Sequence, residues 1–206
     1  MVVMRSRDPY NDALTALAAF AGSGRFGWGE PLVATALAAE LELSQTPVRE
    51  ALARLAGEGL IEHRPGRGYY APSPSADDIV DLYEIHRRLV HLAIDLLDAA
   101  GTTVALQSVG ERSEERFYAA LVRSPGRAVL AQTHWRLTLR LRPIRIVSAE
   151  LAPPDLAWIV GVERHVADGA LVALRREVDL HHRERSALAT AVVAVMRQSV
   201  ESIGQI

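Results

Sequence analysis

The 206-residue chain contains no cysteine and no lysine, and it has no long apolar run. Without cysteine there is no disulfide framework, no thiolate-ligated zinc or iron–sulfur cluster and no thiol nucleophile. A chain of this kind suits a reducing compartment, so we expect it in the cytoplasm. No stretch approaches the roughly 18 apolar residues that a membrane helix requires, and the first eight residues show no signal-peptide pattern. Neither membrane insertion nor secretion is expected.

Positive charge is not in excess either. All 23 basic residues are arginine and 25 residues are acidic, which gives a formal net charge of −2. Up to Ser75 there are seven arginines and eight acidic residues, so this part alone carries −1. Such a chain cannot bind nucleic acid through bulk charge, and any DNA binding must depend on a local patch.

A segment rich in proline and serine, residues 71–75, lacks apolar periodicity and is typical of a linker. The chain is long enough for two small domains, each with its own core. We therefore expect one domain over residues 1–72 and a second over residues 73–206.

The first domain begins with helical patterns. Asp8 and Pro9 predict the cap and the first position of an opening helix. A second helix is expected over about Pro31 to Leu41. A third follows almost at once, capped either by Ser44 or by Thr46. The apolar positions of this third helix share one face, and they are Val48, Ala51, Leu52 and Leu55. Its opposite face is free to contact a partner.

Two short strands are predicted after the third helix. Leu60 to His63 and Gly68 to Ala71 flank a strong turn signal, Arg64-Pro65-Gly66-Arg67. Three helices followed by a β-hairpin with an arginine on each side of its tip describe a winged helix-turn-helix.

Everything downstream is predicted to be helical. Ser75 caps a helix with apolar positions at alternating spacings of three and four, namely Ile79, Leu82, His86, Leu89, Ala93 and Leu96. Further helices are expected at about 103–123, 126–142, 154–166 and 169–202, the last with a split near Arg183 to Arg185. The expected fold class is mainly α, with the winged helix-turn-helix joined to an all-α helical bundle.

One run of the first domain resembles a known family. The matching letters are LAAELELSQTPVREAL at 37–52, RL at 54–55, EGLI at 58–61 and GRG at 66–68. Over about residues 12–72 the pattern resembles the DNA-binding domain of GntR-family transcription regulators, and its TPVREAL core is highly specific.

A recognition helix enters the major groove with its first turn foremost, so its N-terminal side chains reach base edges. Arg49 can donate two parallel hydrogen bonds to guanine, and Gln45 can pair in the same way with adenine. Arginines at the hairpin tip would reach the backbone or the minor groove. Arg54 is equally able to pair with Glu50 or Glu58 on its own helix. The expected DNA-contacting residues are Ser44, Gln45, Thr46, Arg49, Arg54, Arg64, Gly66 and Arg67.

The second half, beginning at residues 81–85 (DLYEI), resembles the FadR-type subgroup, whose helical, FCD-like C-terminal domain binds effectors. The resemblance implies a small organic acid, often beside a metal held by an aspartate, a histidine four residues later and two further histidines. Here Glu114 stands at the aspartate position and Tyr118 at the first histidine position. The next histidine position falls near Leu156, with His165 as an alternative.

The last position of that set, at His181 or His182, keeps its histidine. A glutamate, a tyrosine and a histidine together supply too few strong ligands for a divalent ion, so no metal ligands are assigned. No cofactor is expected, with a divalent metal as the alternative. The expected effector-binding residues are Glu114, Tyr118, Arg136, Arg140 and His181.

Several of these residue types have simpler explanations. His86 on the helical seam is typical of a hydrogen-bonded core histidine. The His181-His182 pair, among charged neighbours, favours a solvated face over a site. The arginines at 136, 140, 142 and 145 fit either a hydrated helix face or an anion site.

We expect a sequence-specific, dimeric transcription regulator, a repressor by analogy with the family, that reads a palindromic operator in double-stranded DNA and senses a small metabolite, a carboxylate being one candidate. No nucleophile and base, carboxylate pair or metal cluster occurs at an interpretable spacing, so an enzyme is not expected. The alternative is a winged-helix protein-interaction module whose C-terminal bundle serves only for dimerisation.

Overall fold

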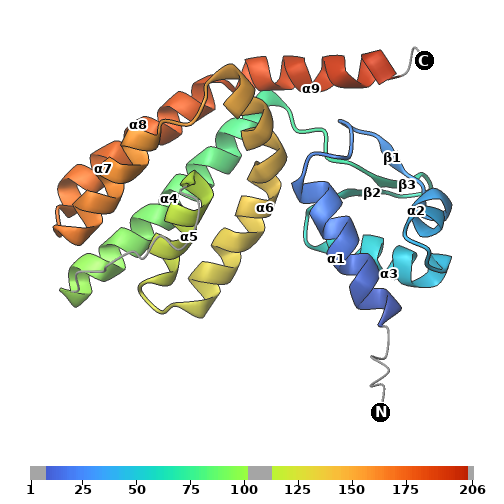
Figure 1. The fold of residues 1–206 in the computed structure, drawn as a ribbon, viewed down its shortest axis with the longest axis horizontal. Coiled ribbons are helices and arrows are strands. Elements are labelled where there is room, and N and C mark those ends of the chain that lie inside the picture. The colour runs from blue at the N-terminus through green and yellow to red at the C-terminus, as the bar shows by residue number, and fades with distance from the viewer. Residues whose placement is uncertain (1–7, 102–112, 204–206) are drawn as a thin grey trace. The chain divides into compact units, whose positions relative to one another are not determined.

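A computed structural model describes residues 8–101 and 113–203 of the chain. It divides into two compact units, one comprising the residues up to Ser73 together with those from Val195 onward, the other Pro74 to Ala194. The described part is mainly helical with one small three-stranded sheet, which confirms the expected fold class (Figure 1). Within these residues, no helix combines the length and apolar character needed to cross a bilayer.

The helices of the first unit are α1 (Pro9–Gly22), α2 (Ala34–Glu40) and α3 (Gln45–Gly57). As predicted, the Asp8 side chain caps α1 by accepting a hydrogen bond from the Asn11 backbone N–H, and Pro9 occupies the first helical position. α1 packs against α3, and α3 packs against α2. The buried face of α3 contains the four predicted apolar residues and also Pro47.

A small antiparallel sheet completes the first unit. Its strands β1 (Pro31–Leu32), β2 (Glu62–Arg64) and β3 (Gly68–Tyr70) lie in the order β1-β3-β2. The prediction that Pro31 begins the second helix is wrong, because Pro31 pairs with Tyr70 across the sheet and the helix starts three residues later. Proline is tolerated on an edge strand, where its missing N–H costs no ladder hydrogen bond.

The second unit is built on a long helix, and it includes α9 only as far as Ala194. Its elements are α4 (Ala76–Ala100), α5 (Glu114–Arg123), α6 (Ala128–Leu151), α7 (Leu156–Ala167), α8 (Leu171–Ala187) and α9 (Ala189–Ile203). α4 contacts α5, α6 and α8, and α7 packs against α8 (Figure 1). The predicted helix over 103–123 is observed from Glu114 onward, and its first part lies outside the described residues.

α4 begins at the predicted cap. The Ser75 hydroxyl accepts a hydrogen bond from the Asp78 backbone N–H, and the Asp78 carboxylate accepts one from the Ser75 backbone N–H in return. Gly101 ends the helix with a φ of 59°, a left-handed conformation that glycine adopts at little cost. The buried face is broader than the predicted seam, because it also contains Tyr83, Val90, Ile94 and Leu97.

Two predicted helix boundaries are wrong. Pro143 does not end α6, which continues to Leu151. Leu141, Ile144 and Ser148 are buried on both sides of this proline, and their packing offsets the hydrogen bond that proline removes. The break in the last helix falls at Leu188 rather than near Arg183 to Arg185.

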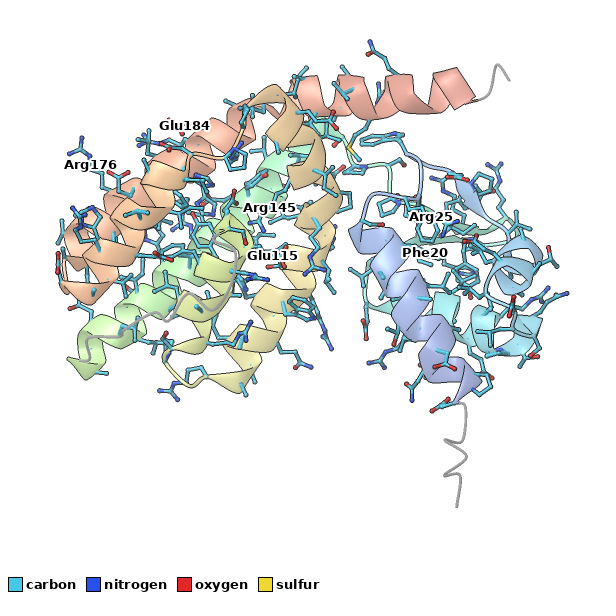
Figure 2. All side chains as sticks on the ribbon, viewed as in Figure 1. Phe20, Arg25, Glu115, Arg145, Arg176 and Glu184 are labelled. Carbon is cyan, nitrogen blue, oxygen red and sulfur yellow. The ribbon has the colours of Figure 1, made fainter. Side chains whose placement is uncertain are left out.

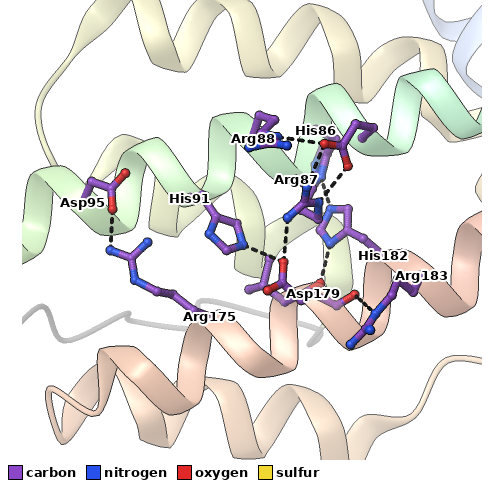
Figure 3. A network of polar contacts seen from close by, with 11 residues as sticks. His86, Arg87, Arg88, His91, Asp95, Arg175, Asp179, His182 and Arg183 are labelled. Atoms are coloured by element: carbon purple, nitrogen blue, oxygen red, sulfur yellow. Dashed lines mark hydrogen bonds and ion pairs between the residues drawn. The ribbon is translucent and has the colours of Figure 1, made fainter.

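The outer seam between α4 and α8 is polar (Figure 3). Arg87 Nη1 donates a hydrogen bond of 2.8 Å to Asp179 Oδ1, and His91 Nε2 lies 2.9 Å from the same oxygen. One turn further along α4, Arg175 pairs with Asp95. These contacts fix α8 antiparallel to α4, which brings His182 opposite His86 inside the unit.

Candidate nucleic-acid interface and buried polar cluster

The first turn of α3 is open to solvent. Ser44 is its N-cap but makes no side-chain capping hydrogen bond. Gln45, Thr46 and Arg49 are exposed, whereas Val48 packs inward. Within the described residues no partner engages the Arg49 guanidinium. This turn therefore offers unpaired backbone N–H groups and free polar side chains at one helix end.

Arg54, further along α3, is not free. Its Nε donates a hydrogen bond of 2.6 Å to Glu58 Oε1, which resolves the choice between Glu50 and Glu58. The Arg54 side chain is still 57% exposed. Exposed pairs of this kind are weak, so the arginine remains able to exchange its partner.

The hairpin presents its two arginines differently. Gly66 at the tip has a φ of 72°, and the Arg67 backbone N–H closes the turn onto the Arg64 carbonyl at 2.9 Å. The Arg67 side chain is exposed, whereas Arg64 Nη2 donates a hydrogen bond of 2.8 Å to Glu62 Oε2. The Arg64 guanidinium also stacks over the Tyr70 ring, 4.1 Å from its centroid.

This pairing changes the ionisation of Glu62. Burial raises the pKa of the Glu62 carboxyl. Hydrogen bonds from Arg64 and from the Ser73 backbone lower this pKa by more than burial raises it, so the net shift is downward. Glu62 thus stays ionised and holds Arg64 along the strand. A similar restraint acts on Arg25, whose guanidinium lies 4.0 Å from the Phe20 ring centroid and pairs with Glu40 (Figure 2).

In the second unit, three of the five predicted effector residues meet. Glu114 and Tyr118 lie one turn apart on α5, and His181 Nε2 of α8 lies 3.1 Å from Glu114 Oε2. Arg136 and Arg140 do not join them, since both are exposed on α6. The expectation of a solvated face at His181 and His182 is wrong: the two histidines are only 8% and 2% exposed.

An arginine completes this group. Arg145 Nε lies 3.0 Å from Glu114 Oε1, and both side chains are nearly buried, with 12% and 13% exposed. Arg185 Nε lies 3.9 Å from the other oxygen of Glu114. Burial raises the pKa of the Glu114 carboxyl, but Arg145 first and His181 next lower it more, so the carboxylate stays ionised.

Three buried histidines connect to Arg145 in a chain (Figure 3 shows two of them). His182 Nδ1 lies 2.7 Å from the Val178 carbonyl, so this nitrogen carries the proton and Nε2 accepts. His86 Nδ1 lies 2.7 Å from His182 Nε2 and is therefore the donor. His86 Nε2 is left as an acceptor, 3.1 Å from His134 Nε2 and 3.2 Å from Arg145 Nη2.

This hydrogen-bond chain requires uncharged imidazoles. Burial is the main cause that lowers the pKa of all three histidines, and the charge of Arg145 acts in the same direction. The pKa falls to about 4 for His134 and to about 3 for His182. The prediction that His86 is a hydrogen-bonded core histidine is confirmed.

Aromatic rings also pack against the histidines of this group. The Trp158 ring of α7 stacks on His181 with centroids 4.1 Å apart, and Tyr118 packs edge-on against His86 at 4.9 Å. Buried polar atoms nearby that have no hydrogen-bond partner include Arg145 Nη1, Tyr118 Oη, Thr138 Oγ1, Trp158 Nε1 and Tyr83 Oη. Glu114 Oε1, Arg145 Nε and His181 Nε2 make only the ion-pair contacts given above. We call the residues His86, Glu114, Tyr118, His134, Thr138, Arg145, Trp158, His181, His182 and Arg185 the buried polar cluster.

Sequence reasoning missed His134 and Thr138 of this cluster, and it named Arg145 only within the group of four arginines at 136, 140, 142 and 145. His134, Thr138 and Arg145 follow one another at spacings of four and seven, which places them on one face of α6. That signal was present, but a helix ending at Pro143 separates Arg145 from the other two. Arg185 carried no comparable pattern.

The ligand set of a divalent metal does not fit this cluster. Among residues 8–101 and 113–203, no three His, Asp or Glu side chains are arranged to hold one ion. The Glu114 carboxylate already faces three cationic or proton-donating groups, and both ring nitrogens of His86 and of His182 already have hydrogen-bond partners. Metal binding would require breaking these contacts.

Residues 6–70 match the family model described as "Bacterial regulatory proteins, gntR family". The chain is 40% identical over 74 residues to the "Nta operon transcriptional regulator" of Aminobacter aminovorans, covering 36% of this chain and 35% of that protein. It is 33% identical over 106 residues to the "Probable D-xylose utilization operon transcriptional repressor" of Paenarthrobacter nicotinovorans, covering 47% of each. The chain thus spans less than half of the length of these relatives.

A solved structure shares the fold over most of the chain. A Rhodococcus sp. RHA1 protein described as transcriptional regulator GntR superposes with a TM-score of 0.69 at 20% identity, covering 90% of this chain and 99% of that one. The matched family and relatives are regulators rather than enzymes. Over residues 6–70, this chain is similar to the GntR family of bacterial regulatory proteins.

Proposed function

We propose that the chain is a dimeric, sequence-specific DNA-binding transcription regulator of the FadR-type subgroup, acting as a repressor in the cytoplasm. Residues 1–72 form its DNA-binding domain, and residues 73–206 form its dimerisation and effector-binding domain. The observation that carries the proposal is the exposed first turn of α3, where Arg49 has no partner within the described residues. The name of the Paenarthrobacter relative supports the repressor role.

In this proposal α3 enters the major groove with its first turn foremost. Arg49 donates two hydrogen bonds to a guanine, Gln45 pairs with an adenine, and Thr46 contacts a neighbouring base edge. Ser44 and the backbone N–H groups beside it hold a phosphate. At the hairpin tip Gly66 lets the backbone approach the DNA, and Arg67 reaches the backbone or the minor groove. Arg54 and Arg64 would join after exchanging their carboxylate partners for phosphate.

The low net charge of this domain supports dimerisation. With seven arginines and eight acidic residues up to Ser75, one copy gains little non-specific attraction from DNA. Two copies related by a twofold axis read a palindrome, and their contacts then add. An effector bound in the second domain would regulate binding by favouring one arrangement of the two recognition helices.

Selection of genomic fragments by the purified chain, followed by footprinting, tests the proposal. The expected result is a short palindrome that the wild type protects and that Arg49→Ala leaves unprotected at the protein concentration that just saturates the wild type. The matched control is Arg127→Ala, which removes an exposed arginine from the second unit and should leave protection intact. No selected fragment, or equal protection by the wild type and Arg49→Ala, would favour the alternative of a protein-interaction module.

A further inference from the structure

The carboxylate of Glu62 on β2 binds two parts of the first unit at once. Its Oε2 accepts hydrogen bonds from Arg64 Nη2 at 2.8 Å and from Arg64 Nε at 3.2 Å. Its Oε1 accepts one of 3.0 Å from the Ser73 backbone N–H. Ser73 is the middle residue of 72–74, which we call the connection because the second unit begins at Pro74. Glu62 therefore bridges the hairpin arginine and the connection.

Resting on the DNA-binding role proposed above, we propose that Glu62 is a positioning residue that couples the DNA affinity of Arg64 to the binding of Ser73. The carboxylate holds Arg64 back from DNA while Ser73 is bound to it. Release of Ser73 frees the arginine for a phosphate. Binding of the arginine to DNA in turn weakens the hold on Ser73, because coupling between two sites is reciprocal.

The connection has few hydrogen bonds of its own. Pro72 and Pro74 have no backbone N–H, so Ser73 supplies the only backbone donor of this stretch. That donor binds the Glu62 side chain rather than a strand. The Pro72 carbonyl accepts a longer hydrogen bond, 3.4 Å, from the Gly29 N–H. The shortest hydrogen bond that anchors the connection is therefore the one to Glu62.

Arg64 is held but remains accessible. Strand pairing places Glu62, Arg64 and Tyr70 on one face of the hairpin, and the Arg64 side chain is 37% exposed there. Exposed ion pairs are weak, because water competes for both charges. A DNA phosphate offers the guanidinium the same charge-assisted hydrogen bonds as a carboxylate does. Arg64 can thus exchange Glu62 for a phosphate.

The two contacts of Glu62 support each other. Ordering a long side chain costs conformational entropy, and either contact alone would have to overcome that cost. Once Ser73 orients the carboxylate, pairing with Arg64 requires less further ordering, and the reverse also holds. Loss of Ser73 from the carboxylate therefore weakens the hold on Arg64. A pull on the connection would reach the hairpin through this one side chain.

A double-mutant cycle tests the effect of Glu62 on Arg64. We expect Glu62→Gln to lower the Kd about fivefold, for the selected operator and for a duplex of unrelated sequence alike, because a phosphate contact reads no base. In an Arg64→Gln background the same substitution should change the Kd by less than about twofold. Glu42→Gln is the control, since it removes an exposed carboxylate from the same unit and should leave the Kd nearly unchanged.

Two substitutions at Ser73 test the effect of the connection. Ser73→Pro removes the N–H donor, and proline fits there because Pro74 already favours an extended conformation at the residue before it. Ser73→Ala removes only the hydroxyl, which lies 3.4 Å from Glu62 Oε1. We expect Ser73→Pro to lower the Kd about threefold, except in a Glu62→Gln background, and Ser73→Ala to change it by less than about twofold.

A measurement without DNA tests the bridge itself. Hydrogen bonds from Arg64 and from the Ser73 backbone both lower the pKa of the Glu62 carboxyl. NMR titration of this side chain should therefore show a higher pKa in Arg64→Gln and in Ser73→Pro than in the wild type. A pKa that neither substitution raises would contradict the bridge, whether or not the chain binds DNA.

Four further results would overturn the inference: no tightening by Glu62→Gln, equal tightening by Glu42→Gln, a gain that persists without Arg64, or a Kd that Ser73→Pro leaves unchanged. A wild type that binds its operator and gives any of these results refutes the coupling alone. A wild type that binds no DNA refutes the regulator proposed above, and this inference with it.

Discussion

Arg145 Nε on α6 lies 3.0 Å from Glu114 Oε1 on α5, and the two side chains are only 12% and 13% exposed. A buried ion pair of this kind specifies how the two helices meet, because either partner alone would leave an uncompensated charge inside the unit. The same pair lies at the centre of the buried polar cluster, so the packing and the chemistry of the second unit depend on one contact.

Glu114→Gln is expected to lower the free energy of unfolding by about 3–5 kcal/mol, since it leaves Arg145 and Arg185 without a buried counter-charge. Denaturant unfolding measures the change. Glu58→Gln is the control, because it removes the partner of the exposed Arg54 and should cost less than about 1 kcal/mol. Equal losses in the two variants would contradict a special role for the buried pair.

Arg49→Ala should weaken operator binding by about 1–3 kcal/mol, or roughly fivefold to 150-fold, and relax the base preference at one position of each half-site. Arg54→Ala should cost less, because Glu58 already holds that guanidinium. Gel-shift titrations against the selected operator and single-base variants measure both. A larger loss for Arg54→Ala would mean that its ion pair breaks on binding and that Arg54 reads a base.

Arg67→Ala is expected to weaken binding to all sequences by a similar factor, since an arginine at the wing contacts backbone rather than a specific base edge. The slope of log Kd against log salt should fall by about one per protomer. Titrations at several salt concentrations measure it. An unchanged slope with altered sequence preference would instead indicate a base contact in the minor groove.

Acid should destabilise the chain. An unfolded histidine takes up a proton as the pH falls below its ordinary pKa near 6.5, whereas folded His134 and His182 do so only near pH 4 and pH 3. Their contribution to stability is thus complete above pH 6.5 and is lost as the pH falls toward 4, at roughly 1 kcal/mol per histidine and pH unit. Unfolding free energies over this range should fall less steeply for His134→Gln; a slope identical to the wild type would refute this account.

Ser75→Ala removes the hydrogen bond that the Ser75 hydroxyl accepts from the Asp78 backbone N–H and the one that it donates to the Asp78 carboxylate, and it should cost about 1 kcal/mol of stability. Ser44→Ala makes the same change at the N-cap of α3, where no side-chain capping bond exists, and should cost little. The contrast is measured by thermal unfolding. Any loss of DNA affinity in Ser44→Ala then reports a contact with DNA rather than a damaged helix.

Local signals in the sequence were sufficient for the winged helix-turn-helix. The cap at Asp8 and Pro9, the apolar face of α3 and the turn at residues 64–67 act within a few residues of one another, so their outcome depends little on the rest of the chain. β1 was missed because two residues have no periodicity of their own. They become a strand only where β3 pairs with them.

For the site in the second unit, the sequence alone determined which chemical groups are present: an acid at 114, a tyrosine at 118 and paired histidines at 181 and 182. Tertiary packing decided which of them meet. Packing keeps α6 helical through Pro143, so Arg145 lies on the same inward face as His134. Packing also places α8 antiparallel to α4, so His182 lies against His86. Such contacts join residues 31 to 96 positions apart, and their energies come from shared burial, which no local pattern encodes.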